Sequence, residues 1–97
     1  MDQLDPIIHQ PCRLQIMSAL CQLKEDTRVD FSYLKDLIGL TDGNLGAHLA
    51  TLEGKGYIAL TKEFVMRKPK TFISVTPAGR AAFNGHVSAL KSLLLPK

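Results

Sequence analysis

Apolar residues recur every three or four positions in the first half of the chain, which is the spacing of helices with one buried face. The first such stretch starts at Pro11, a residue that suits the first turn of a helix because its missing N–H is no loss there. The stripe that predicts this helix consists of Cys12, Ile16, Leu20 and Leu23. Before it, residues 4–9 are expected to form a separate short helix capped by Asp5.

Two further helices are expected in close succession, after a polar loop and a short strand at residues 28–30. Asp30 is a suitable N-cap for the first of them, and Gly39 supplies the positive φ that ends it. Thr41 caps the second, which is expected over residues 42–55. Their buried faces consist of Phe31, Leu34, Leu37 and Ile38 in the first and of Leu45, Leu49 and Leu52 in the second. The linker of about three residues is the length found in helix-turn-helix units.

Two short strands with a basic turn between them follow, and we call this hairpin, residues 57–75, the wing. Every second residue along it is apolar, namely Ile58, Leu60 and Phe64 in the first strand and Ile73 and Val75 in the second. Lys62 interrupts this alternation in the first strand. Pro69 is expected to stiffen the turn, and Thr76 with Pro77 opens a last helix over about residues 77–94. The order of elements predicts one domain over residues 1–97, mainly α with a small antiparallel β-wing. That is a winged helix-turn-helix with extra N- and C-terminal helices.

Charge is distributed unevenly over the 97 residues. The net charge is +3, but residues 1–40 carry −2 and residues 41–97 carry +5. The basic half contains the third helix and the wing, so an anionic partner is favoured, although a solvated basic surface would give the same count. Because the chain has neither a long apolar run nor an apolar segment after Met1, we expect a cytoplasmic protein.

Candidate catalytic and metal-binding residues are sparse. Cys12 and Cys21 lie on opposite sides of one predicted helix, so they are expected to be free thiols. His9 and His86 have no ligand spacing with either cysteine, and we predict no metal site and no cofactor. The sequence offers no paired carboxylates, no glycine-rich phosphate loop and no Cys/His dyad, so an enzyme is not expected.

The outer face of the third helix is small and nearly uncharged, which suits close approach to the floor of a DNA major groove. Asn44 can pair with adenine, and Thr51 can offer a hydroxyl or a methyl group. The residues predicted to contact DNA from this helix are Thr41, Gly43, Asn44, Ala47, His48, Thr51 and Lys55. His48 lies on the flank of the face, where a half-buried histidine bonded to backbone is an equal alternative. Three glycines disfavour a purely structural surface helix.

The wing is predicted to supply phosphate contacts or an arginine that enters the adjacent minor groove. Its cations are Lys62, Arg67, Lys68 and Lys70, opposed by Glu63 alone. A charged tip that only keeps the hairpin soluble is the alternative. Together, this helix and the wing predict a protein that binds double-stranded DNA.

The last helix has more apolar surface than a small domain needs for its own core. A seam at heptad-like spacing consists of Phe83, Val87, Leu90 and Leu94. We expect it to form a homodimer interface together with Ile7 and Ile8 from the N-terminal segment. A two-fold dimer would place two recognition helices about one turn of DNA apart. The alternative is a helix packed wholly on its own monomer.

These residues together resemble the small, stand-alone winged-helix transcriptional regulators of the MarR/ArsR kind from bacteria and archaea. The similarity covers nearly the whole chain and is carried by residues 4–14, 30–35, 40–45, 48–49, 52–53, 56–58 and 60, the wing, and residues 76–80. The Leu-Thr-Asp-Gly-Asn-Leu and Thr-Pro-Ala-Gly pieces are its most specific parts. The resemblance implies a homodimeric regulator with its third helix in the major groove, and it leaves room for an unidentified small-molecule effector.

The chain departs from that family at two points. Gly46 and Ala47 replace the polar or charged residues that are frequent in the family, which removes DNA contacts and puts strong sequence specificity in doubt. The paired cysteines of the ArsR metal box are absent, so metal sensing does not carry over. A winged helix used as a protein–protein interaction module, with little sequence-specific DNA binding, is therefore the alternative function.

Overall fold

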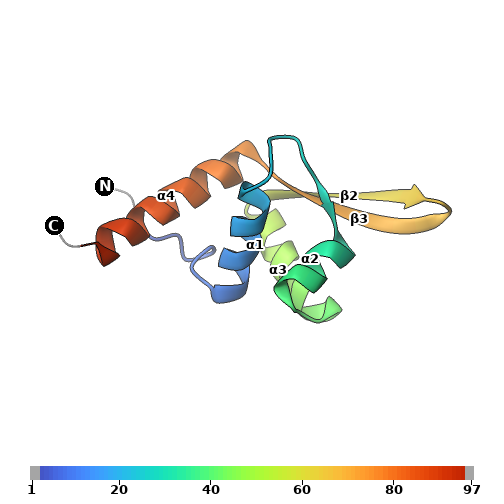
Figure 1. The fold of residues 1–97 in the computed structure, drawn as a ribbon, viewed down its shortest axis with the longest axis horizontal. Coiled ribbons are helices and arrows are strands. Elements are labelled where there is room, and N and C mark those ends of the chain that lie inside the picture. Colours follow the sequence, from blue (N-terminus) through green and yellow to red (C-terminus); the bar gives the residue numbers. More distant parts are fainter. Residues whose placement is uncertain (1–2, 96–97) are drawn as a thin grey trace.

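The computed structural model describes residues 3–95 and confirms the predicted fold class. The elements, in chain order, are α1 (Pro11–Cys21), β1 (Val29–Asp30), α2 (Phe31–Ile38), α3 (Asp42–Gly54), β2 (Ile58–Val65), β3 (Lys68–Val75) and α4 (Pro77–Leu94). Figure 1 shows α1, α2 and α3 as a central body, from which α4 and the β2–β3 hairpin extend in opposite directions. The molecule is therefore elongated, with extents of 55 × 25 × 21 Å.

Side-chain caps fix where the helices begin. The side chains of Asp30, Thr41 and Thr76 accept hydrogen bonds from backbone N–H groups in the first turns of α2, α3 and α4, as predicted. Gly39 has a φ of 79° and ends α2 in the left-handed conformation. These local signals make the boundaries of all three helices predictable from sequence.

The sheet has the strand order β1-β3-β2, and both strand pairs are antiparallel. β2 and β3 pair from Ile58 opposite Val75 to Val65 opposite Lys68, which leaves Met66 and Arg67 as a two-residue loop. Both loop residues have positive φ, 52° and 66°, as the favoured two-residue hairpin turns require.

The placement of Pro69 differs from the prediction. It lies within β3 opposite Phe64 rather than in the turn. A two-residue loop makes Val65 and Lys68 a hydrogen-bonded pair, so Pro69 falls at the next position, where its missing N–H would point away from β2. The strand tolerates proline there because β1 pairs only with Phe72 and Ile73, farther along β3.

The core is centred on α1, which contacts α2, α3, α4 and β3. Its fully buried residues are Ile8, Ile16, Met17, Leu20, Leu34, Leu45, Leu49, Leu52, Ile73 and His86. Two sequence predictions were wrong here. The stripe of α1 includes Met17 and stops before Leu23, since the helix ends at Cys21. Residues 4–9 form one turn, closed by a bond of 2.7 Å from the His9 amide to the Asp5 carbonyl, instead of a helix.

The first turn of α4 is held against the junction between α3 and β2. The Thr76 amide donates to the Tyr57 carbonyl at 3.0 Å, and the Thr76 hydroxyl donates to the Gly56 carbonyl at 2.6 Å. The same turn packs so closely that a Cβ placed on Gly79 would lie 2.0 Å from the Tyr57 carbonyl oxygen. Arg80 then donates to the carbonyls of Cys21 and Leu23, which satisfies the end of α1.

A buried polar cluster joins the N-terminal segment to α4. His86 is 1% exposed, and its Nδ1 accepts a hydrogen bond of 2.9 Å from the Asp5 amide. Its Nε2 lies 3.4 Å from Nδ1 of His9. The Asp5 carboxylate accepts from the Tyr57 hydroxyl and from two amides of its own turn. Burial and the hydrogen bond to Asp5 raise the pKa of Tyr57 to about 12.

We expect this cluster to make stability depend on pH. Burial, with His9 alongside, lowers the pKa of His86 below its ordinary 6.5, and Asp5 opposes that shift. Between the two values the unfolded chain binds more protons, so the free energy of unfolding should fall as the pH drops below about 6.5 and level off below the folded pKa. Chemical denaturation between about pH 7 and pH 5 measures this.

His86→Asn provides the matched variant, because its Oδ1 can replace Nδ1 as acceptor without titrating. The variant should show a flatter dependence over this range than the wild type. Equal losses of stability in wild type and His86→Asn would contradict the assignment to His86. The contacts of Asp5 should be lost only at a lower pH. Burial would raise the pKa of the Asp5 carboxyl, but its hydrogen bonds outweigh burial and hold the pKa below 3.8.

Candidate nucleic-acid interface

The outer face of α3 is exposed and free of charge over most of its length. Gly43, Asn44, Ala47 and Thr51 are all exposed, whereas the opposite face is buried in the core. The Thr41 side chain accepts from the Asn44 amide at 3.2 Å, and the Thr51 hydroxyl donates to the Ala47 carbonyl at 3.2 Å. Within residues 3–95, the side-chain amide of Asn44, unlike the hydroxyls of Thr41 and Thr51, makes no hydrogen bond. Lys55 lies at the exposed C-cap.

The glycines of α3 have no packing role within the protein. A Cβ built on Gly43, Gly46 or Gly54 would meet no heavy atom within 4 Å, apart from the helix's own backbone and chain neighbours. Each glycine costs about 1 kcal/mol of helix stability relative to alanine. Internal packing does not explain why the helix retains them, so close approach of an external surface becomes the stronger explanation.

His48 lies on the flank of this face and contacts α1. Its ring is half-buried, and its Nδ1 lies 3.2 Å from Nη1 of Arg13, which can donate to it. Neither alternative considered from sequence included this side-chain partner. With Nδ1 occupied, Nε2 is the ring nitrogen that could meet a phosphate or base, and that contact stays a prediction.

The wing cations divide between the two faces of the hairpin. By strand alternation, Lys62 shares a face with Phe64, while Lys68 and Lys70 lie on the other face, and Arg67 occupies the tip. Lys70 lies 3.7 Å from a carboxylate oxygen of Asp30. Among residues 3–95, no ion pair involves Lys62, Arg67 or Lys68. These three are therefore the wing cations best placed for phosphate.

Arg28 is a charged residue of this region that the sequence did not single out. Its guanidinium forms a bidentate ion pair with Glu63 and stacks 4.1 Å from the centroid of the Phe72 ring. The hydrogen bond to Glu63 raises the pKa of Arg28 and lowers the pKa of Glu63. Glu63 is thus neutralised within the protein and offsets the other wing cations less than its sequence position suggests.

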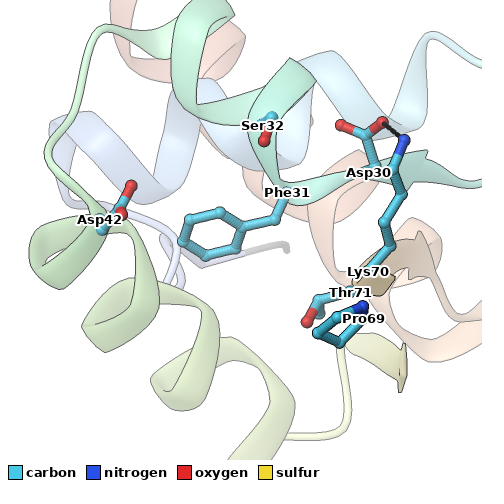
Figure 2. Close-up of a pocket in the computed structure, with 7 residues that line it drawn as sticks. All are labelled: Asp30, Phe31, Ser32, Asp42, Pro69, Lys70 and Thr71. Atoms are coloured by element: carbon cyan, nitrogen blue, oxygen red, sulfur yellow. Dashed lines mark ion pairs between the residues drawn. The ribbon is translucent and has the colours of Figure 1, made fainter. Parts of the chain in front are cut away.

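A cleft separates the helix-turn-helix from the wing. It has a volume of about 360 Å³ and is lined by Asp30, Phe31, Ser32, Asp42, Pro69, Lys70 and Thr71. Figure 2 shows Ser32 and Phe31 on the α2 side, Asp42 at the start of α3, and the three β3 residues across from them. Lys35 lies 2.8 Å from Asp42, and that hydrogen bond raises the pKa of Lys35. The two carboxylates of this cleft, beside the exposed face of α3, were not among the predicted features of the site.

Asp42 should weaken the attraction of this surface for phosphate, because it stands at the start of α3 with 74% of its side chain exposed. We expect Asp42→Asn to raise the affinity for duplex DNA by about fivefold at low salt, since it removes a like charge and frees Lys35. The same change should cost about 0.5 kcal/mol of stability, because an acid at a helix N-terminus is favourable. Fluorescence anisotropy and thermal unfolding measure the two effects.

Asp26→Asn is the matched control, since Asp26 lies in the loop before β1, where its φ of 65° also suits asparagine. It removes the same charge away from the cleft and should change the affinity by less than about twofold. Equal gains from both substitutions would show that net charge matters and the position of Asp42 does not.

The residues predicted for a dimer contact are in different environments. Ile7, Phe83, Val87 and Leu90 are half-buried, and Leu94 is 77% exposed at the end of α4. Ile8 is 0% exposed and belongs to the core of the monomer. This burial leaves no surface of Ile8 for the predicted dimer contact, and an apolar residue in the N-terminal segment suits a core and an interface equally. Over residues 3–95, no helix is both long and apolar enough to span a bilayer.

Proteins from other organisms are similar to this chain in sequence and in fold. The chain is 34% identical over 87 residues to an uncharacterised protein of Methanocaldococcus jannaschii, a match that covers 90% of this chain and 91% of that protein. A transcriptional regulator homologue from Pyrococcus horikoshii OT3 has a similar structure, with a TM-score of 0.81 and 30% identity over 91% of this chain and 84% of the other.

A more distant structure shares the fold. A protein of Porphyromonas gingivalis W83 assigned to the MarR family of transcriptional regulators gives a TM-score of 0.70 at 22% identity, with 93% of this chain and 85% of that one covered. The family model of the winged helix DNA-binding domain matches residues 12–94, from the start of α1 to the end of α4. The chain therefore belongs to the winged helix DNA-binding domain family.

Proposed function

We propose that this protein is a homodimeric transcriptional regulator that places α3 in the major groove of duplex DNA and the wing on the adjacent backbone or minor groove. The observation that carries the proposal is the outer face of α3, whose glycines have no internal packing role, next to a wing with three cations outside the ion pairs of residues 3–95. The family membership and the Pyrococcus horikoshii homologue support the same function.

Within this proposal, the wing provides most of the affinity and α3 provides modest specificity. Asn44 is the side chain suited to adenine, and Thr51 can contact a thymine methyl group or a polar base edge. Arg67, Lys68 and Lys62 contact phosphates, with Lys55 and Thr41 at the two ends of α3 as further backbone contacts. The uncharged centre of the face lacks the cation that usually recognises guanine.

The dimer would form through the apolar seam of α4. Leu93, Leu94 and Leu95 are 68%, 77% and 62% exposed, so the last turn of α4 and its C-cap leave apolar surface uncovered within the monomer. A two-fold contact there would cover that surface and bring two recognition helices to half-sites about one turn apart. Sedimentation should detect the dimer, and Leu94→Lys should dissociate it.

Selection of bound DNA from a random duplex pool, followed by the salt dependence of the enriched sequence, tests the proposal. We expect a short, palindrome-like site and an affinity that falls with salt at a slope of about −0.9 for each phosphate contact. Failure to bind any duplex at low salt, genomic fragments included, would refute the function. Enrichment of an asymmetric site would refute the two-fold dimer alone.

A protein–protein interaction module is the second candidate, and one observation favours it. Tyr33 and Leu37 are 54% and 55% exposed beside a groove of about 430 Å³ between α1 and α2, on a surface separate from the wing. This function predicts a stable protein complex that excludes DNA and tolerates removal of Arg67 and Lys68. Leu37→Lys should break that complex while leaving binding to a selected duplex intact.

A further inference from the structure

The tip of the wing exposes two large apolar side chains. Phe64 is 79% exposed and Met66 is 91% exposed, the highest values among the exposed large hydrophobic residues of the described chain. Neither packs against the hydrophobic core. The monomer therefore gains no burial from them, and their exposure at the end of a projecting hairpin points to a role outside the fold.

The hairpin presents these side chains in a fixed arrangement. Phe64 lies opposite Pro69, whose ring restricts the φ of the β3 backbone at that position. By strand alternation, Phe64 lies on the same face of the hairpin as Leu60, which packs on the core. Met66 is the first residue of the two-residue loop, with a φ of 52°. Figure 1 shows the tip extending well beyond the helices, and within residues 3–95 its apolar side chains remain exposed.

The charges around the tip indicate what could cover it. Lys62 lies two residues before Phe64 on the same face, Arg67 follows Met66 in the loop, and Lys68 follows Arg67. Apolar side chains surrounded by cations complement a binding surface that has apolar groups at its centre and anionic groups along its edges. The minor groove of DNA has this character, with phosphates on both rims and stacked bases between them.

We propose that the wing tip is an apolar wedge, in which Phe64, supported by Met66, enters between two base pairs from the minor groove and bends the duplex towards the major groove. Lys62, Arg67 and Lys68 hold the flanking phosphates. This inference rests on the proposed DNA binding and adds deformation of the DNA to it. A wedge favours base steps that unstack at low cost, namely TA and CA/TG steps.

The wedge gives the protein a source of specificity that its α3 face lacks. Selection at a deformable step would act through the energy of bending, at base pairs that the recognition helix does not contact. Sites enriched from the random pool should therefore carry a pyrimidine–purine step on each outer side of the α3 contacts.

Two measurements on the enriched duplex test the wedge: energy transfer between dyes at its ends, and the fluorescence of 2-aminopurine at the outer step. The wild type should shorten the end-to-end distance and brighten the 2-aminopurine. Phe64→Ala should lose most of both signals and bind about tenfold more weakly, with an unchanged salt slope. Phe64→Trp should keep the signals, because it retains a large flat side chain.

Phe64→Lys separates a wedge from an electrostatic contact. It should raise the salt slope, because it adds a phosphate contact, and still lose the 2-aminopurine signal. If the Phe64→Ala variant bent the duplex as much as the wild type does, the wedge would be refuted, although the proposed DNA binding would stand. Absence of all DNA binding would overturn the proposed function itself.

Two other outcomes would also overturn the wedge. One is a change of sedimentation from dimer to monomer in Phe64→Ala, which would assign the tip to a protein contact. The other is binding to vesicles of phosphatidylserine and phosphatidylcholine that is lost in Phe64→Ala while DNA bending persists.

Discussion

Replacing Gly79 with alanine should destabilise the protein by about 3 kcal/mol, which lowers the Tm by roughly 15 °C in a domain of this size. The added Cβ would lie 2.0 Å from the Tyr57 carbonyl oxygen, 2.8 Å from the carbonyl carbon and 3.0 Å from the Cα. All three are backbone atoms, so no side chain can rotate away to make room. α4 would have to move off the α3–β2 junction, which would break the hydrogen bonds that Thr76 makes there.

Gly85→Ala provides the control on the same helix. A Cβ on Gly85 would meet no heavy atom within 4 Å beyond the helix's own backbone and its chain neighbours. That substitution should stabilise the fold by about 0.5–1 kcal/mol through helix propensity. Thermal unfolding of both variants gives the comparison. A Gly79→Ala protein that melts within a few degrees of the wild type would show that α4 does not pack so closely on Tyr57.

The double variant Arg67→Gly/Lys68→Ala should weaken DNA binding by roughly a thousandfold at physiological salt. A dimer with both wings on DNA would lose four phosphate contacts, and the salt slope should flatten by about 4 units. Glycine suits the φ of 66° at position 67, so the turn should form at least as well as in the wild type. Anisotropy titrations over a range of salt concentrations measure both quantities.

Lys24→Ala/Lys91→Ala removes the same charge from the loop after α1 and from the last turn of α4, away from the wing. Its binding should weaken by less than about tenfold, with little change in slope, because charges beyond a Debye length are screened. If the two double variants behaved alike, the wing would not be the main phosphate contact, and the basic net charge would explain the affinity.

The starts of α2, α3 and α4 and the end of α2 could be predicted because their causes are local. A cap at Asp30, Thr41 or Thr76 acts on a backbone N–H three residues away, and Gly39 ends α2 through its own φ. The alternation that predicts the wing is equally local, since each residue's face follows from its neighbours. The candidate interface inherits this predictability, because it consists mostly of one capped helix and one hairpin.

The contacts between distant segments could not be predicted in the same way. Nothing in a single sequence joins Asp5 to His86, Arg13 to His48, or Arg28 to Glu63. Each pair depends on how whole elements pack, and the contact with Arg13 changes the hydrogen-bonding capacity of the candidate residue His48. For Ile8 the error had the same origin, because an apolar residue in the N-terminal segment suits a core and an interface equally.

The contacts of α4 with the body of the protein are uneven along its length. Its first residue follows Thr76, whose amide and hydroxyl are bonded to Tyr57 and Gly56 directly after α3, whereas the last turn extends away from the body. Because His86 and Ala89 are buried farther along α4, a displacement of the last turn would meet those contacts before it reached Thr76.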